Sequence, residues 1–133
     1  MNNKIKYEGF FIDERMDGSL DKLIKNQHVT TEFKPLITHS ELYGEKVFFI
    51  VTGYGNDKEN EGLSVKLYGE TNEQLKELYK KIPVPHITLS VSEHGKSVNT
   101  SRLVFTGNKF KGRILSATFG ASDGHEVIYA PQK

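Results

Sequence analysis

The period of the apolar residues constrains this chain most, because it favours β-strands along most of its length. Residues 63–68 and 86–91 alternate apolar with polar side chains. Side chains two apart share one face of a strand, so this alternation predicts strands that bury one face. Runs rich in aromatic and β-branched residues, such as KVFFIVT, predict further strands. The expected strands cover residues 7–12, 27–33, 46–52, 63–68, 86–91, 102–105, 113–119 and 125–129.

Two segments have helical spacing instead. Residues 71–82 carry apolar side chains three and four apart, and Thr71 precedes Gln74 in a capping-box pattern. Residues 20–24 show the same spacing over a shorter stretch, after an Asp-Gly-Ser turn. Residues 53–62 are polar and glycine-rich, which predicts an exposed connection. Strand–helix–strand order therefore occurs twice, without a strict sequence repeat, and we expect an α+β domain of two similar lobes.

Composition limits the classes of protein to which the chain can belong. Its 133 residues suit one domain, residues 1–133, and a chain of this size can bury a substantial core. The absence of cysteine excludes disulfides and thiolate metal sites, and it fits a reducing cytoplasm. The net charge of +1 argues against a long duplex nucleic acid as partner, but it is compatible with a short anionic ligand.

Membrane and secretory signals are missing from the sequence. No run approaches the roughly 20 apolar residues of a membrane helix. The amino-terminal lysines are not followed by a long apolar stretch, so we expect no signal peptide. We therefore expect a soluble, cytoplasmic protein that acts as a monomer.

Two of the expected strands contain the same polar pair. The stretches QHVTTEF and PHITLSV each hold histidine, one apolar residue and threonine. His28 and Thr30 share one strand face, as do His86 and Thr88, and the opposite face of the second stretch is apolar. The two histidines lie 58 positions apart, and each follows an expected helix. Equivalent strands of two lobes would then face one another across a cleft.

Two histidines and two threonines in one cleft suit acid–base chemistry at phosphorus. Imidazole has an ordinary pKa of about 6.5, so its neutral and charged forms are both accessible near neutral pH. One ring can take a proton from an attacking oxygen while the other protonates the departing oxygen, each role giving about 10²–10⁴-fold in rate. Threonine hydroxyls can donate to the non-bridging oxygens. A single His-x-Thr motif is more often structural, and it is the presence of two such motifs that favours a catalytic role.

The two stretches resemble the paired His-x-Thr motifs of the two-histidine (2H) phosphoesterase superfamily, which includes LigT-like RNA ligases and cyclic phosphodiesterases. The resemblance covers both motifs, the strand pair and helix between them, and the bilobed order. It implies a LigT-like α+β fold in which two antiparallel sheets form a central cleft and helices lie outside. It also implies that His28, Thr30, His86 and Thr88 line that cleft and act without metal or cofactor.

The expected function is hydrolysis of a nucleotide or oligonucleotide phosphodiester: a 2′,3′-cyclic phosphate, a 2′–5′ linkage or a cyclic nucleotide signal. Degradation of such a signal, including by a viral enzyme that silences host immunity, and RNA end healing are both open. One alternative is an RNA end-processing enzyme or 2′–5′ RNA ligase, and another is a nucleotide-binding module without catalysis. The base and the acid are not assigned, because the two roles exchange with the direction of ring opening.

Further residues are candidates for substrate binding, each with a simpler structural role. Lys34 would supply a cation, Tyr54 would stack on a base, and Ser90 would border the site. In the simpler interpretation Lys34 is only exposed, Tyr54 packs in its loop, and Ser90 is a solvated strand residue. The hydroxyls of residues 99–101 would contact a nucleotide or form a turn. The remaining histidines have no ligand-like spacing, so we predict no metal site at His39, His94 or His125.

Overall fold

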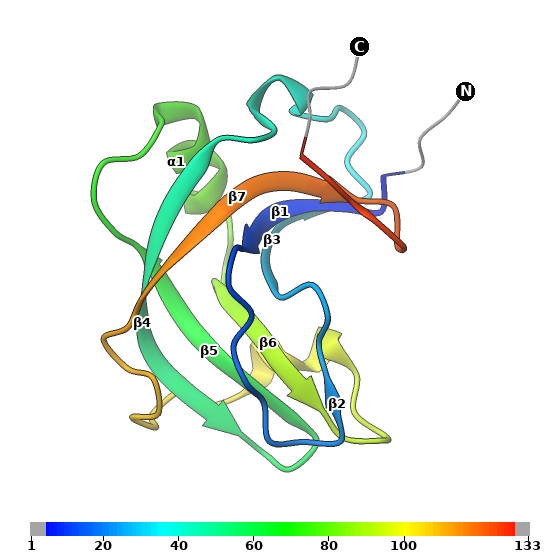
Figure 1. The fold of residues 1–133 in the computed structure, drawn as a ribbon, viewed down its shortest axis with the longest axis vertical. Helices are drawn as coiled ribbons and strands as arrows, with labels where there is room; N and C mark the ends of the chain where they lie inside the picture. The colour runs from blue at the N-terminus through cyan, green and yellow to red at the C-terminus, as the bar shows by residue number, and fades with distance from the viewer. Residues whose placement is uncertain (1–4, 130–133) are drawn as a thin grey trace.

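The computed structural model describes residues 5–129, which form one antiparallel sheet of eight strands with one α-helix (Figure 1). The strands are β1 (Tyr7–Ile12), β2 (Lys22–Leu23), β3 (His28–Phe33), β4 (Lys46–Asn56), β5 (Asn60–Leu67), β6 (His86–Val91), β7 (Ile114–Ser122) and β8 (Val127–Ile128). The helices are α1 (Glu73–Lys80) and two 3-10 turns, η1 (Ser40–Leu42) and η2 (Ser97–Arg102). The strand order is β2-β6-β5-β4-β7-β1-β3, and β8 pairs with β7.

The expected pair of sheets with outer helices is wrong. β4 pairs with β5 along one edge and with β7 along the other, so it joins what were to be two lobes into a single sheet. Strand pairing is therefore continuous from β6 to β3. The bilobed α+β, LigT-like architecture is replaced by a mostly-β open sheet with one short helix.

The helix expected at residues 20–24 does not form. β2 pairs there with β6, and the amide of Ile24 donates to the carbonyl of Leu89 on that strand. The amide of Leu20 donates to Ser90 Oγ, also on β6. These amides bond to the sheet and not to carbonyls of their own segment. A helical pattern this short is marginal by itself, so the sheet contacts decide the local structure.

The connection expected at residues 53–62 consists mostly of strand. β4 and β5 extend through it and pair with one another almost to the turn. Gly53 lies against a crossing segment, because a Cβ there would overlap the carbonyl oxygen of Phe105. Tyr54 forms an isolated bridge with Gly107 of the same segment. Glycine in this stretch therefore permits close backbone approach and does not mark an exposed loop.

Other elements agree with the sequence to varying degrees. β1, β3 and β6 coincide with expected strands, and α1 lies within the expected helix. Asn72 caps α1, and not Thr71: its side chain accepts from the amides of Gln74 and Leu75 at 2.8 and 3.3 Å. The strand expected at residues 102–105 is absent, and η2 ends there instead.

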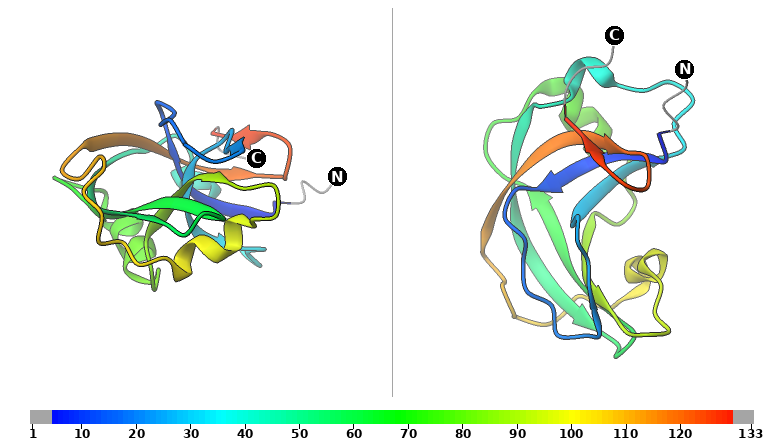
Figure 2. Two further views of the ribbon diagram at one scale, coloured as in Figure 1. Left: turned by 90° about the horizontal axis from the view of Figure 1, so that it is seen from below. Right: turned by 45° about the vertical axis from the view of Figure 1, so that its right-hand side comes forward.

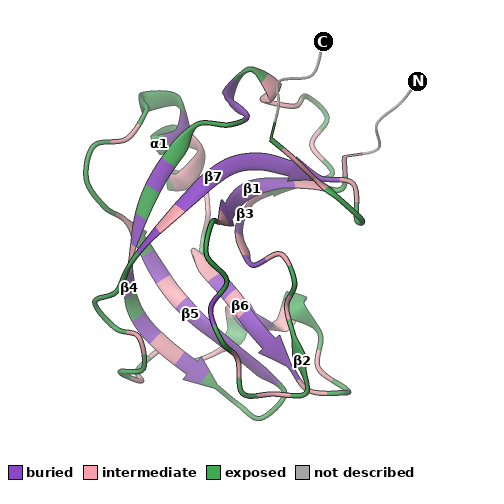
Figure 3. Cartoon of the chain, in the orientation of Figure 1, coloured by how far each residue is buried: buried purple, intermediate pink, exposed green. Residues whose placement is uncertain are grey.

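Buried positions run along the strands of the curved sheet (Figure 3). Leu75 of α1 belongs to the same hydrophobic core as these strand residues. Phe10 lies there between Phe49 and Phe119, at ring-centroid distances of 5.3 and 5.5 Å. No helix within residues 5–129 is long and apolar enough to cross a membrane.

Candidate active site

The curvature of the sheet brings β3 and β6 together although they lie near opposite ends of the strand order (Figures 1 and 2). Between them is a pocket of about 510 Å³ that contains both His-x-Thr pairs. η2 lies beside β6 and supplies part of the wall. The pocket is lined by Tyr7, Ile24, Asn26, His28, Thr30, Phe33, His86, Thr88, Ser97, Val98 and Ser101.

Side-chain alternation places both pairs as the sequence indicates. Val29 of β3 and Ile87 and Leu89 of β6 are fully buried in the core. The histidines and threonines on either side of them are partly accessible and line the pocket. The structure thus brings the four predicted residues to one cavity, from strands that are remote along the sheet.

His28 lies against an aromatic wall. Its ring stacks on Tyr7 at 4.5 Å and 22°, and its centroid is 5.3 Å from that of Phe11. Burial lowers the pKa of His28; a hydrogen bond to the carbonyl of Asn26 opposes this shift, and charge on His86 adds to it. The two imidazoles are therefore close enough to influence each other electrostatically, and the neutral form of His28 is favoured.

Both histidines are held by the same local device. Nδ1 of His28 is 2.7 Å from the carbonyl oxygen of Asn26, and Nδ1 of His86 is 2.7 Å from that of Val84. A carbonyl oxygen only accepts, so Nδ1 carries the proton in each ring. Nε2 is left as the nitrogen that can exchange a proton with a ligand.

A buried polar chain supports Thr88. Its hydroxyl donates to Thr100 Oγ1 at 2.8 Å, and the side-chain amide of Asn60 donates to the same oxygen at 2.9 Å. Asn60 also donates to the carbonyl of Lys96 at 2.7 Å. Thr100 and Asn60 are almost completely buried, so this chain fixes η2 against β5 and β6 behind the pocket.

The other three candidates do not line this pocket. Lys34 is exposed, follows β3 and adopts a left-handed backbone conformation with φ 46°. Tyr54 donates its hydroxyl to the buried carboxylate of Glu61. Ser90 is fully buried and donates to the same carboxylate at 2.6 Å. Tyr54 and Ser90 therefore serve a structural hydrogen-bond network, and the reading of Ser90 as a solvated strand residue is also wrong.

A repeated Glu-Gly pair accompanies the two histidine strands. Gly9 of β1 pairs with Thr30, and Gly62 of β5 pairs with Thr88. In both cases the register shifts between this glycine and the preceding glutamate, as at a β-bulge. A Cβ on either glycine would overlap backbone of the neighbouring strand. The Glu-Gly repeat is visible in the sequence, in YEGFFI and NEGLSV. It marks the strands that pair with the two histidine strands, which the alternation of apolar residues alone did not reveal.

Each glutamate of the repeat is fully buried and anchors a loop. Glu8 accepts from the amide of His39 at 2.7 Å, from its Nδ1 at 2.8 Å and from the Tyr43 hydroxyl at 2.7 Å. Glu61 holds the segment before β2 through the amide and hydroxyl of Ser19, at 2.7 and 2.9 Å. That segment leads directly to Ile24 and Asn26 in the pocket wall.

Glu8, Glu32 and His39 form the one group within residues 5–129 whose ligand atoms lie close enough to hold a metal ion, all within 4.8 Å. Glu8 already accepts three hydrogen bonds there, two of them from His39. These bonds account for the carboxylate of Glu8 without an ion. The prediction that the chain has no metal site stays a prediction.

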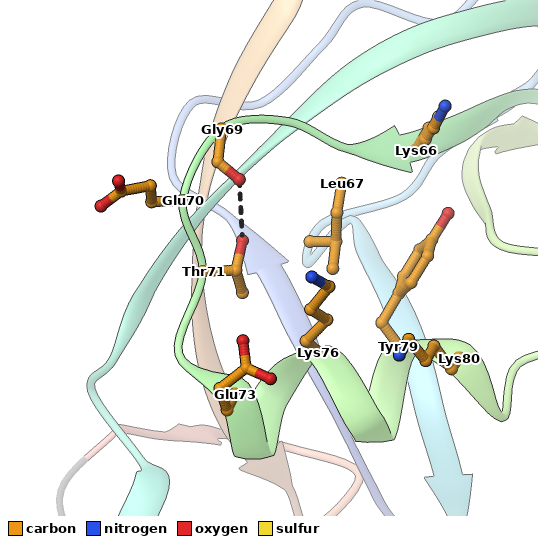
Figure 4. A pocket seen from close by; sticks show the side chains of 9 residues that line it. All are labelled: Lys66, Leu67, Gly69, Glu70, Thr71, Glu73, Lys76, Tyr79 and Lys80. Carbon is orange, nitrogen blue, oxygen red and sulfur yellow. Dashed lines mark hydrogen bonds between the residues drawn. The ribbon is translucent and has the colours of Figure 1, made fainter.

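A larger hollow of about 640 Å³ lies between the end of β5 and α1 (Figure 4). Its lining contains side chains of both charges, so it does not form a uniformly positive or negative surface. The charged residues are Lys66, Lys76, Lys80, Glu70 and Glu73. It contains neither histidine, and Tyr79 closes one end of it. The larger hollow is therefore not the one that holds the predicted motif residues.

Several pocket residues were not predicted from the sequence. Tyr7, Phe33 and Val98 line it with aromatic and apolar side chains. Ser101, one of the hydroxyl residues considered as a nucleotide contact, also lines it. Tyr7 and Phe33 are paired across β1 and β3, next to a predicted motif, so the strand register was the missing information. Comparison with known proteins adds no further candidates, because no protein-family model, curated protein or solved structure matches the chain.

Proposed function

We propose that the chain is a metal-independent phosphodiesterase of the two-histidine kind, acting on a nucleotide phosphodiester. The observation that carries the proposal is that both His-x-Thr pairs line one pocket, with each histidine held through Nδ1 to a backbone carbonyl. Structural histidines would not need matching orientations in a shared cavity. Two Nε2 atoms that face one ligand can instead supply a base and an acid together.

The reaction needs only water and the two imidazoles. The oxygen of water forms a bond to phosphorus while one of its protons passes to the Nε2 of the neutral ring. The bond from phosphorus to a ribose oxygen breaks, and this oxygen takes a proton from Nε2 of the charged ring. One proton is gained and one is lost by the histidine pair, so exchange with solvent restores the starting state.

The surroundings of the two rings favour one assignment of roles in hydrolysis. The lowered pKa of His28 keeps this ring neutral near pH 7, as a general base must be. His86 then acts as the acid. The threonines lie beside the reacting group, where Thr30 can donate to a non-bridging oxygen. Thr88 donates to Thr100 in the free protein and would have to turn its hydroxyl to do the same.

The lining of the pocket indicates a small substrate. Among its eleven lining residues there is no lysine or arginine. Long RNA is usually held by several cationic phosphate contacts, which this pocket lacks. A volume of about 510 Å³ and walls of Tyr7, Phe33 and Val98 suit a nucleoside beside one phosphodiester.

Hydrolysis of defined substrates with EDTA present tests the proposal. The panel contains 2′,3′-cyclic mononucleotides, 2′–5′ and 3′–5′ dinucleotides and cyclic dinucleotides. We expect His28→Ala and His86→Ala each to lower kcat/KM by at least about 100-fold. The exposed histidines His94 and His125 lie outside the pocket, so His94→Ala and His125→Ala are matched controls that retain activity.

Each rival function gives a different result in the same assay. Tight binding of a panel member without turnover would favour a nucleotide-binding module. Joining of RNA ends, in place of hydrolysis, would favour a ligase. Turnover that disappears with EDTA, or survives loss of both histidines, would refute the paired-histidine mechanism.

A further inference from the structure

We propose that the substrate carries a nucleoside on each side of the reacting phosphodiester, and that the second nucleoside occupies a subsite next to His86. This inference rests on the proposed function, because it takes the phosphorus to lie between the two histidines. It selects dinucleotides, linear or cyclic, over 2′,3′-cyclic mononucleotides.

A second pocket adjoins the first on the side of His86. It has a volume of about 290 Å³ and shares Thr30, Phe33, His86 and Ser101 with the first pocket. The shared residues include one member of each His-x-Thr pair. A phosphodiester held by them would therefore have open space on both sides, one space in each pocket.

The walls of the second pocket suit the face of a base. Ile82, Pro83 and Val84 precede β6 and give it an apolar side. Glu32 also borders it, and none of its lining residues is a lysine or arginine. His86 is shared with the first pocket and is engaged by the reacting phosphodiester, so no further cation is left for a second phosphate. Apolar walls without cations favour an uncharged nucleoside over a terminal phosphate group.

Phe33 stands at the boundary of the two pockets. It lines both of them and is 64% exposed, so its ring is accessible to a ligand from either pocket. Its ring is 5.8 Å from that of Tyr7, which lines the first pocket only. An exposed aromatic ring in this position can stack on a base without selecting its sequence.

A cyclic mononucleotide would leave one of the pockets empty. Stacking of one additional base changes binding by about 5- to 150-fold. If this binding is retained in the transition state, kcat/KM rises by the same factor. The strained five-membered ring makes adenosine 2′,3′-cyclic phosphate intrinsically more reactive than a dinucleotide, so the preference is measured as affinity. By calorimetry we expect adenylyl dinucleotides to bind about 5- to 150-fold more tightly than adenosine 2′,3′-cyclic phosphate.

The test measures kcat/KM for these substrates with the whole chain and with Val84→Gln. Val84 lines only the second pocket and is 37% exposed, so a longer polar side chain there obstructs the apolar wall without disturbing the core. The Val84 carbonyl holds His86 for both substrates, so any loss through that contact is shared by them. We therefore expect Val84→Gln to lower kcat/KM for the dinucleotide at least about 5-fold more than for the cyclic mononucleotide. The matched control is Val104→Gln at an exposed valine that lines neither pocket.

The outcomes separate this inference from the proposed function. Turnover of the mononucleotide together with equal affinities for mononucleotide and dinucleotide would overturn the subsite and leave the phosphodiesterase intact. Equal losses for both substrates in Val84→Gln would do the same. If nothing is hydrolysed, calorimetric binding of the same ligands decides: tighter dinucleotide binding that Val84→Gln weakens supports the subsite, and equal affinities refute it.

Discussion

Replacing Glu61 by glutamine tests how the structure holds one wall of the pocket. The carboxylate is fully buried. Its Oε1 accepts from the amide of Ser19 at 2.7 Å and from Ser90 at 2.6 Å. Its Oε2 accepts from the Ser19 hydroxyl at 2.9 Å and from Tyr54, with Lys109 at 3.6 Å. Glu61→Gln keeps the size of the side chain and removes its charge.

The expected loss of stability follows from the number of hydrogen bonds. The amide oxygen must take the place of Oε1, because the backbone amide of Ser19 can only donate. The new NH₂ group then faces hydroxyls that must reverse their direction. Bonds to a charged group are worth about 1.5–3 kcal/mol and neutral ones about 0.5–1.5, so four bonds lose about 4 kcal/mol in total. Easier burial of a neutral group offsets part of this, leaving about 2–4 kcal/mol.

Urea unfolding at pH 7, followed by circular dichroism, measures the change in the free energy of unfolding. The matched control is Glu59→Gln, which neutralises an exposed glutamate two positions away and should change stability by less than about 0.5 kcal/mol. If Glu61→Gln lowered the free energy of unfolding no more than the control does, the buried network would not stabilise the fold.

The pH dependence gives a second check on the same network. Burial acts to raise the pKa of Glu61, but hydrogen bonds from Ser90, Tyr54 and Ser19 outweigh it, so the pKa lies below its usual value. A carboxyl with a lowered folded pKa stabilises fully above its unfolded pKa, about 4.3, and loses that contribution as the pH falls through the folded value. The difference between wild type and Glu61→Gln should therefore shrink below about pH 4.

Three further predictions concern stability. Because the pKa of His28 is lowered, its contribution is complete above the unfolded value of about 6.5 and declines as the pH falls below it; urea midpoints of His28→Gln should vary less than those of wild type across this window. Asn72→Ala should cost about 1 kcal/mol by uncapping α1, and Asn108→Ala, at an exposed asparagine, almost nothing. Thr100→Val leaves one donor of the buried Asn60 amide without its acceptor, and thermal unfolding should show a loss of about 1–3 kcal/mol.

The sequence predicted the strands that alternate clearly but not how they join. The alternation in β6 was sufficient, since Ile87 and Leu89 are buried and His86 and Thr88 are not. The prediction of a helix at residues 20–24 failed because the spacing of its few apolar residues is compatible both with a helix and with a strand that contacts β6. Such a choice depends on partners remote in sequence, including the carboxylate of Glu61. Local spacing carries no information about them.

The candidate site was predictable in part for a related reason. A motif placed in a strand defines which side chains share a face, so the four His-x-Thr residues could be selected without a fold. Tyr54 was chosen for its flanking glycines, and Ser90 because strict alternation would place it on the face of His86. Both contact Glu61 instead, and in β6 the register shifts between Thr88 and Ser90. Tyr7 was missed because its ring reaches His28 only through the pairing of β1 with β3, and the sequence does not show the register of that pairing.

Why an open sheet brings its remote strands together follows from the repeated Glu-Gly pair. A β-bulge strengthens local twist, and one lies in each histidine strand. Thr31 of β3 is the extra residue opposite Glu8 and Gly9, and Leu89 of β6 is the extra residue opposite Glu61 and Gly62. A third register shift lies in β4 before Gly53. The resulting curvature turns β3 and β6 towards a common pocket without a second sheet.

The repeat also shows where the two halves of the site differ. In register, Phe11 is the partner of His28, and Ser64 is the partner of His86. These partners occupy equivalent positions, each two residues after the glycine of the Glu-Gly pair. An aromatic partner removes water from one imidazole, and a hydroxyl-bearing partner leaves the other ring in polar surroundings. The same backbone arrangement thus holds two histidines in unlike surroundings, and the proposed division into a base and an acid depends on such a difference.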